Sequence, residues 1–191
     1  MIKRRRSIDY IDGEKPLVCN RVSAYFAPVL TKISERGAPT NAAVAIVAAK
    51  YNGKYTDALV ESAKEELAAG GISRVEVVRV PGSFEIPVVA ARLANANDPE
   101  FEAIICFGAI FQGQTSHAQN IADSVSHSLA DLQIHSGKPI IHGVLLFQDE
   151  EQASVRCFGK EHNRGIEAAR TAIEMVRVMR SLQNFDRELL D

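Results

Sequence analysis

The sequence predicts an α/β domain in which a four-stranded parallel sheet lies between two layers of helices. Four short apolar runs are each long enough for one strand, and segments with helical spacing separate them. Strands that alternate with helices form right-handed β–α–β units, which place helices on both faces of the sheet. We therefore expect a three-layer α/β/α sandwich.

In the first unit, residues 43–49 form a continuous apolar run, as expected of a strand that is covered on both faces. Thr56 is predicted to cap a helix whose apolar residues recur every four positions and which ends at Gly70-Gly71. Residues 75–80 are the second strand. Ser83 is the predicted N-cap of a helix over residues 84–95, with Pro87 in its first turn.

The second half of the chain repeats the alternation. A third strand over residues 103–107 is expected to break at Gly108, and a long helix begins at about Ser116. The fourth strand covers residues 139–146. Two further helices are expected over residues 149–157 and 163–182.

The first 41 residues differ from the rest of the chain in their sequence pattern. They open with a basic run at residues 3–6, contain some amphipathic spacing at 25–33, and end in turn-forming residues. The basic run is either the start of a flexible arm or a tag for the nucleus or for nucleic acid. We predict an N-terminal extension over residues 1–41 in front of an α/β domain over residues 42–191.

Composition narrows the class of protein. At 191 residues, the chain can form one domain that buries roughly 70 % of its unfolded surface. Its 22 Lys and Arg nearly balance 24 Asp and Glu, so the chain as a whole is no electrostatic binder of nucleic acid. Three cysteines without a CxxC motif fit a reducing compartment, and neither a signal peptide nor an 18-residue apolar run is visible. We expect a cytoplasmic protein without membrane contact.

The informative loops all follow strands. Tyr51-Asn52 follows the first strand, residues 82–85 the second and residues 109–117 the third, and a fourth strand end lies near residues 145–148. Because the carboxyl ends of parallel strands meet at one edge, where ligands bind in such sheets, these loops should form one site.

The third loop suggests a phosphate site. Gly108-x4-Gly113-Gln114-Thr115 resembles a phosphate-binding P-loop, but Gln114 replaces the lysine that reaches the outer phosphates, which argues against hydrolysis of nucleoside triphosphates. A single phosphate could bind the backbone N–H groups at the helix start and the Thr115 hydroxyl. A cation is needed as well. Three candidates cluster near the turn between the last two predicted helices, which we call the late turn: Arg156, Lys160 and Arg164. This segment could equally be a solvated connection between helices.

His117 is the candidate proton-transfer residue. It lies two residues after Thr115, in the first turn of the predicted helix, and an imidazole can accept and return protons near pH 7. A surface or capping histidine is the alternative. No His, Cys and carboxylate cluster has zinc spacing and no serine lies in a nucleophile elbow, so the residues indicate neither a zinc site nor a serine nucleophile. Of the other histidines, His142 in the fourth strand is the one of interest.

Several short motifs together resemble a known family, the 6,7-dimethyl-8-ribityllumazine synthases of riboflavin biosynthesis, over residues 43–182. In chain order the motifs are Tyr51-Asn52, VPGSFEIP at 80–87, GQTSH at 113–117, GVL at 143–145, EQA with Arg156 at 151–156, and NRGxEAA at 163–169. The resemblance implies a flavodoxin-like fold and a condensation without cofactor. It joins 5-amino-6-(D-ribitylamino)uracil to 3,4-dihydroxy-2-butanone 4-phosphate, giving the lumazine, phosphate and water.

The resemblance also implies a role for individual residues. Tyr51 would stack on the pyrimidine, Ser83, Phe84 and Glu85 would hold the ring and the ribityl hydroxyls, and Ala109, Ile110 and Phe111 would line the ring pocket. Gln114 and Thr115 would hold the phosphate with Arg156 as its counter-charge, and His117 would move protons.

In this family, neighbouring subunits of a pentamer share each site, so His142, Arg156 and Arg164 would come from the next chain. The sequence departs from the family pattern at four places. Gln112 replaces an Arg, Ala118-Gln119-Asn120 follows His117 where an aromatic is common, His142 replaces a Phe, and residues 158–163 break the glycine pattern associated with icosahedral shells. We therefore expect a free pentamer or a pair of pentamers.

Two alternatives belong to other classes. A non-catalytic paralogue that binds flavin or lumazine would keep Tyr51 and residues 83–85 but need neither His117 nor Arg156. A signalling receiver would need carboxylates at the strand ends, and the first strand ends Ala48-Ala49-Lys50, which argues against it.

Overall fold

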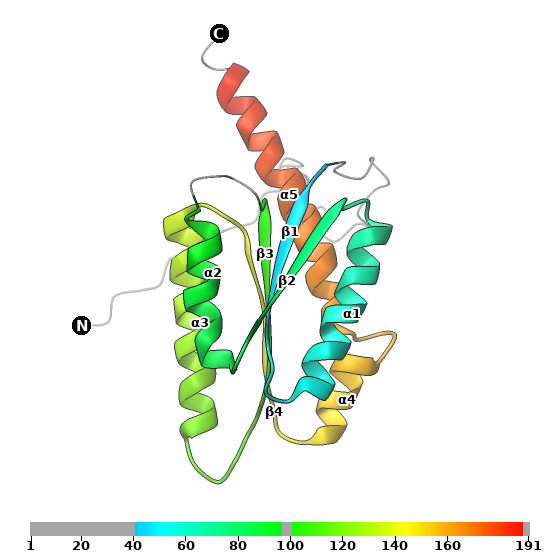
Figure 1. The fold of residues 1–191 in the computed structure, drawn as a ribbon, viewed down its shortest axis with the longest axis vertical. Helices are drawn as coiled ribbons and strands as arrows, with labels where there is room; N and C mark the ends of the chain where they lie inside the picture. Colours follow the sequence, from blue (N-terminus) through cyan, green and yellow to red (C-terminus); the bar gives the residue numbers. More distant parts are fainter. Residues whose placement is uncertain (1–40, 97–100, 189–191) are drawn as a thin grey trace, which may run out of the picture. The chain divides into compact units, whose positions relative to one another are not determined.

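The computed structural model describes residues 41–96 and 101–188 (Figure 1). The predicted extension lies almost wholly outside these residues, so its structure is not considered further. The elements are β1 (Ala43–Ala49), α1 (Gly53–Ala69), β2 (Arg74–Val80), the short 3-10 helix η1 (Ser83–Glu85), α2 (Ile86–Ala94), β3 (Ala103–Phe111), α3 (His117–Ser136), β4 (Ile140–Phe147), α4 (Glu150–Phe158) and α5 (Arg164–Glu188). Within the described residues, no helix is both long and apolar enough to cross a membrane.

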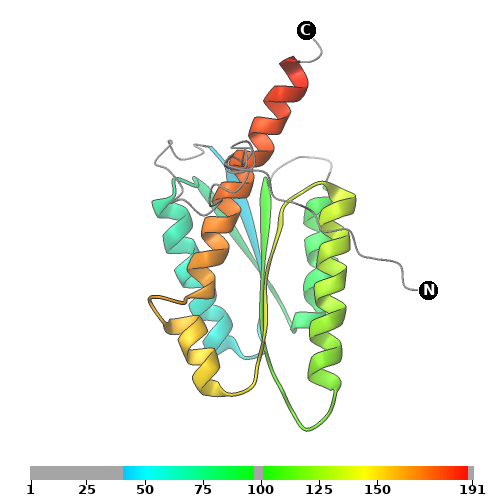
Figure 2. The same cartoon turned by 180° about the vertical axis from the view of Figure 1, so that it is seen from behind.

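The four strands form one parallel sheet in the order β2-β1-β3-β4. Helices α2 and α3 cover one face, and α1, α4 and α5 cover the other (Figures 1 and 2). Every residue of β1 is buried, and its side chains alternate between the two cores: Ile46 packs toward α1 and α5, Val47 toward α2 and α3. The predicted three-layer α/β/α sandwich is confirmed.

The prediction that the third strand breaks at Gly108 is wrong, because β3 continues to Phe111. Its pairing with β4 runs on from Gly108↔Val144 to Phe111↔Phe147, whereas its pairing with β1 ends at Ala48↔Phe107. A Cβ on Gly108 would collide with the Ser83 side chain. The glycine therefore serves a close approach of two segments and does not end the strand.

Both predicted helix caps are also wrong. Helix α1 begins at Gly53, directly after Asn52, and Thr56 is buried inside its first turns, where its hydroxyl donates to the Ala49 carbonyl at 2.9 Å. Ser83 lies in η1, so α2 begins after Glu85. At Thr56, a bond to the end of β1 thus takes the place of the predicted capping bond. Pro87 does lie in the first turn of α2, as predicted.

Candidate active site

A pocket of about 890 Å³ opens at the carboxyl edge of the sheet, on the side covered by α2 and α3. It brings together the loop after β1, the turn after β2, the end of β3 and the first turns of α3. Its lining residues are Tyr51, Asn52, Gly82, Ser83, Phe84, Glu85, Ala109, Ile110, Phe111, His117, Ala118, Asn120, Ile121 and Ser124. The three strand-end loops therefore converge, as the sequence predicts.

Two aromatic side chains of this pocket are exposed in the single chain. Tyr51 is 72 % exposed and Phe84 is 58 % exposed. Both rings follow strand ends, where the backbone directs them away from the core. An exposed aromatic face beside a pocket favours a flat ligand ring, on which it can stack.

Gly82 lets the side chains of Tyr51 and Glu85 both lie close to its backbone. Its backbone N–H donates to Oε2 of Glu85 at 2.9 Å. A Cβ at this position would lie 3.0 Å from the same oxygen and 3.2 Å from Cδ2 of Tyr51. One carboxylate oxygen of Glu85 is thus held in place, and the other makes no hydrogen bond with a described residue.

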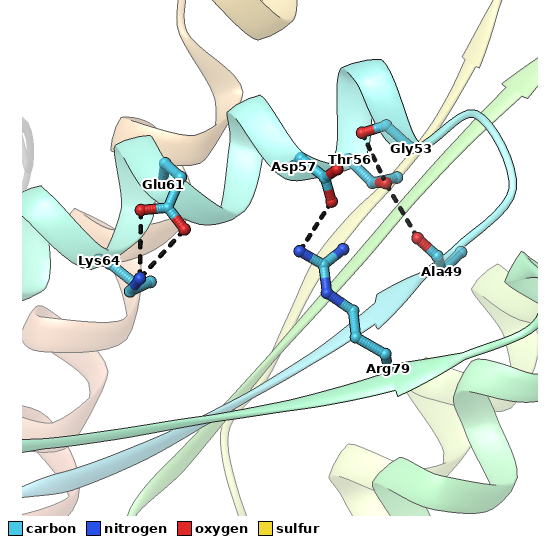
Figure 3. A network of polar contacts seen from close by, with 7 residues as sticks. All are labelled: Ala49, Gly53, Thr56, Asp57, Glu61, Lys64 and Arg79. Carbon is cyan, nitrogen blue, oxygen red and sulfur yellow. Dashed lines mark hydrogen bonds and ion pairs between the residues drawn. The ribbon is translucent and has the colours of Figure 1, made fainter.

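A polar network holds the loop between β1 and α1 (Figure 3). The Thr56 hydroxyl bonds to Ala49 at the end of β1, and Asp57 pairs with Arg79 of β2 at 2.8 Å. On the pocket side, Tyr51 N–H donates to the Pro81 carbonyl at 3.0 Å. Tyr51 is therefore attached to the neighbouring strand end as well as to its own.

The loop between β3 and α3 is exposed and has its own internal bonds. The Gln112 amide donates to the carbonyls of Gly113 at 3.1 Å and Thr115 at 3.3 Å. No side chain caps α3 at Ser116. A Cβ on Gly113 would meet no atom within 4 Å, and this glycine has no positive φ, so the fold does not require it. Together these features leave room for an anion at the helix start.

His117 is the first residue of α3 and lines the pocket next to this loop. Its backbone N–H lies 3.4 Å from Oγ1 of Thr115. Its exposed imidazole makes no hydrogen bond with any described residue. The ring is therefore available to a ligand in the pocket.

Four predicted site residues do not line this pocket. Gln114 and Thr115 lie in the adjoining exposed loop. Arg156 belongs to α4, on the opposite face of the sheet (Figure 2). His142 lies on β4, one of the two outermost strands of the sheet, and borders a second cavity of about 430 Å³.

His142 has a defined partner on α3. Its Nε2 lies 2.8 Å from Oγ of Ser126, and that hydroxyl donates to the Ala122 carbonyl at 2.7 Å. Because a serine has one proton, Oγ accepts from His142 Nε2–H. The neutral ring then carries its proton on Nε2, which leaves Nδ1 as an acceptor at the edge of the sheet.

Of the three candidate cations in the late turn, Arg164 forms an ion pair with Glu167. Arg156 and Lys160 pair with no acidic residue in the described part of the chain. Arg156 is half-buried. Lys160 is exposed.

Several lining residues of α3 were missed by the sequence reasoning. Asn120, Ile121 and Ser124 lie three, four and seven positions after His117 and so share its face of the helix. Helical spacing counted from His117 would have found them.

The buried thiols offer no nucleophile. Burial raises the pKa of Cys106 to about 12 and the pKa of Cys157 to about 11, so both remain protonated near neutral pH. No group of three His, Cys, Asp or Glu side chains in the described residues is arranged to hold a metal ion.

A parallel three-layer sheet with an aromatic-walled pocket at its carboxyl edge, beside a histidine at a helix start, is typical of an enzyme that acts on small molecules. The family model described as 6,7-dimethyl-8-ribityllumazine synthase matches residues 41–180. Similar proteins of that name occur in Stenotrophomonas maltophilia (strain R551-3), at 40 % identity over 146 residues, and in Xanthomonas euvesicatoria pv. vesicatoria (strain 85-10), at 38 % over 146 residues. These alignments cover 75 % of this chain and 93 % and 94 % of the two relatives.

The chain therefore belongs to the 6,7-dimethyl-8-ribityllumazine synthase family, and it is a transferase of riboflavin biosynthesis.

Proposed function

We propose that the pocket described above is where this enzyme condenses 5-amino-6-(D-ribitylamino)uracil with 3,4-dihydroxy-2-butanone 4-phosphate. The observation that supports it best is that His117 lines the same pocket as the exposed rings of Tyr51 and Phe84. A proton-transfer group and two stacking surfaces then face one reaction volume.

The ring half of the site consists of Tyr51, Ser83, Phe84, Glu85, Ala109, Ile110 and Phe111. Here the pyrimidine lies with its flat face against Tyr51 and its edge against the end of β3. Ser83, Phe84 and Glu85 hold the ring and the ribityl hydroxyls. The free oxygen of Glu85 is a suitable acceptor for a hydroxyl, because carboxylate hydrogen bonds are stronger than neutral ones.

The phosphate half of the site consists of Gly113, Gln114, Thr115 and Arg156. The uncapped start of α3 and the Thr115 hydroxyl bind the phosphate, and the glycine lets the backbone approach it. Arg156 neutralises the charge. Because its own chain carries it on the far face of the sheet, Arg156 comes from a neighbouring subunit.

The chemistry needs positioning and proton transfer. The pyrimidine amine attacks the ketone carbonyl and water leaves as the imine forms. Loss of a proton from the neighbouring carbon then expels the phosphate and leaves a carbonyl. The second amine of the pyrimidine attacks this carbonyl, and a second water leaves as the ring closes. His117 moves protons between these groups, a role that typically contributes about 10²–10⁴-fold. Holding the two reactants together can supply up to roughly 7–11 kcal/mol of the barrier reduction.

A pentamer-based assembly, either free or paired, fits the position of His142 as well. His142 lies on β4, an edge strand whose outer side has no partner strand among the described residues. In a ring of subunits this edge can face the next chain's pocket.

We also propose that the enzyme is cytoplasmic. The chain is further proposed to consist of an extension over residues 1–41 and a domain over residues 42–191, and the start of the family match at residue 41 supports this division.

The test mixes the purified full chain with both substrates and follows lumazine absorbance, with each substrate alone as the control. Appearance of lumazine only with both substrates supports the proposal. Tight binding of the pyrimidine without lumazine formation would instead identify a non-catalytic paralogue. Analytical ultracentrifugation of the same sample distinguishes a pentamer from a decamer or a shell.

A further inference from the structure

Asn52 lies at the point where β1 ends and β3 continues. The pairing of β1 with β3 stops at Ala48↔Phe107, so Ala109 has no partner on β1. Its carbonyl instead accepts a hydrogen bond from Nδ2 of Asn52 at 2.7 Å. A side-chain amide thus replaces the next backbone bond of the sheet.

The backbone of Asn52 is specialised too. Its φ of 55° and ψ of 40° are left-handed, a conformation that asparagine tolerates better than most residues. The turn lets the chain pass from Tyr51 directly into α1 at Gly53. Because Tyr51 N–H bonds to Pro81, residues 51 and 52 together connect the ends of β2 and β3.

We propose that Asn52 is a positioning residue: its amide sets the separation between the Tyr51 ring and the edge of β3 lined by Ala109, and hence the fit of the flat substrate ring. This inference rests on the proposed function, and it adds Asn52 as a residue that acts by positioning Tyr51. Neither His117 nor the phosphate half depends on this bond. Losing it should therefore weaken pyrimidine binding more than it slows the chemistry.

Two substitutions separate the amide from the backbone turn. Asn52→Gly keeps the left-handed turn and removes the amide. Asn52→Asp keeps the size and the acceptor oxygen, but it removes the donor and places a negative charge against the Ala109 carbonyl. Each should raise KM for the pyrimidine by about 3- to 10-fold, with kcat changed less than about 2-fold.

Asn95→Ala is the matched control. The Asn95 amide donates to the Ala91 carbonyl at 2.9 Å, at the end of α2 that lies away from the pocket. Its loss removes the same kind of bond and should leave both kinetic constants unchanged. Wild-type KM in both Asn52 variants, or an equal rise in Asn95→Ala, would overturn the inference.

A second readout does not depend on activity. The chain contains no tryptophan, so Tyr51→Trp introduces a single emitter at the ring in question. Adding Asn52→Gly to this variant should lower the tryptophan anisotropy and increase quenching by acrylamide, whereas adding Asn95→Ala should do neither. Unchanged anisotropy would refute the positioning role. Lower anisotropy in the variant, together with a wild-type chain that makes no lumazine, would refute the proposed function alone.

Discussion

The two halves of the candidate site are built in different ways. The ring half rests on three strand ends tied together by long-range contacts, such as the Asn52 to Ala109 bond across 57 residues. The phosphate half available within one chain is a single exposed loop whose side-chain bonds are local, from Gln112 to Gly113 and Thr115. Its first residue is also bonded to the sheet, because the Gln112 N–H donates to the Phe147 carbonyl at 2.9 Å. The proposed ring half is therefore formed within one chain, whereas no Lys or Arg of the described residues lines the pocket beside the proposed anion site.

This difference indicates where a second subunit is needed. A flat ring can be held by stacking and by fixed backbone groups, which one fold can supply. A phosphate needs a counter-charge, because a helix start alone supplies only about 0.3–2 kcal/mol. Substitutions in the two halves should consequently affect different substrates.

The largest effect is expected where the two halves meet. His117→Ala should lower kcat by about 10- to 10³-fold and leave pyrimidine binding intact, because the imidazole transfers protons without forming a wall of the ring half. Steady-state kinetics with both substrates, together with calorimetry for the pyrimidine, measure the two quantities. His135→Ala, at the other end of α3, is the control. Unchanged turnover in His117→Ala would remove this residue from the mechanism.

The next effect concerns the counter-charge. Arg156→Ala should raise KM for the phosphate-bearing substrate by about 10- to 100-fold, the range for a charge-assisted hydrogen bond, and leave the pyrimidine nearly unaffected. Arg170→Ala removes a surface cation that pairs with Glu66 at 2.7 Å and should change neither constant. If Arg156→Ala weakened both substrates equally, its assignment to the phosphate half would be wrong.

A smaller effect should appear in the ring half. Gly82→Ala puts a methyl group 3.0 Å from Glu85 Oε2 and 3.2 Å from the Tyr51 ring. The extended backbone at Gly82, with φ −137° and ψ 179°, accepts alanine, so the crowding falls on the two side chains. We expect weaker pyrimidine binding by about 5- to 10-fold, measured by calorimetry, and the same KM for the phosphate-bearing substrate. Wild-type pyrimidine affinity would show that Tyr51 and Glu85 need no fixed position.

The smallest effect is the counterpart in the phosphate half. Gly113→Ala adds a methyl group into open space, so the melting temperature should not change. Its KM for the phosphate-bearing substrate should rise about 2- to 3-fold, because the methyl group keeps the backbone farther from the anion. A selective change in pyrimidine binding would contradict the division of the site into two halves.

Much of the ring half could be predicted because its motifs lie directly after strands. Tyr51, residues 83–85 and residues 109–111 follow apolar runs whose parallel direction brings their ends to one edge. The parallel direction of the strands was enough to predict that these residues gather around one pocket. Individual caps did not follow, because the Thr56 hydroxyl bonds to the end of β1 and Ser83 lies inside the 3-10 helix that precedes α2.

The sequence by itself determined the order of strands and helices, the edge at which their loops meet and the place of His117 at a helix start. These features depend on local hydrophobic periodicity and on the handedness of parallel crossovers. Only the tertiary structure decided that β3 runs past β1, that Asn52 closes the gap, and that Arg156 lies on the opposite face from the pocket. Each of these features depends on how segments far apart in the chain pack against one another, and no local pattern of residues specifies that packing.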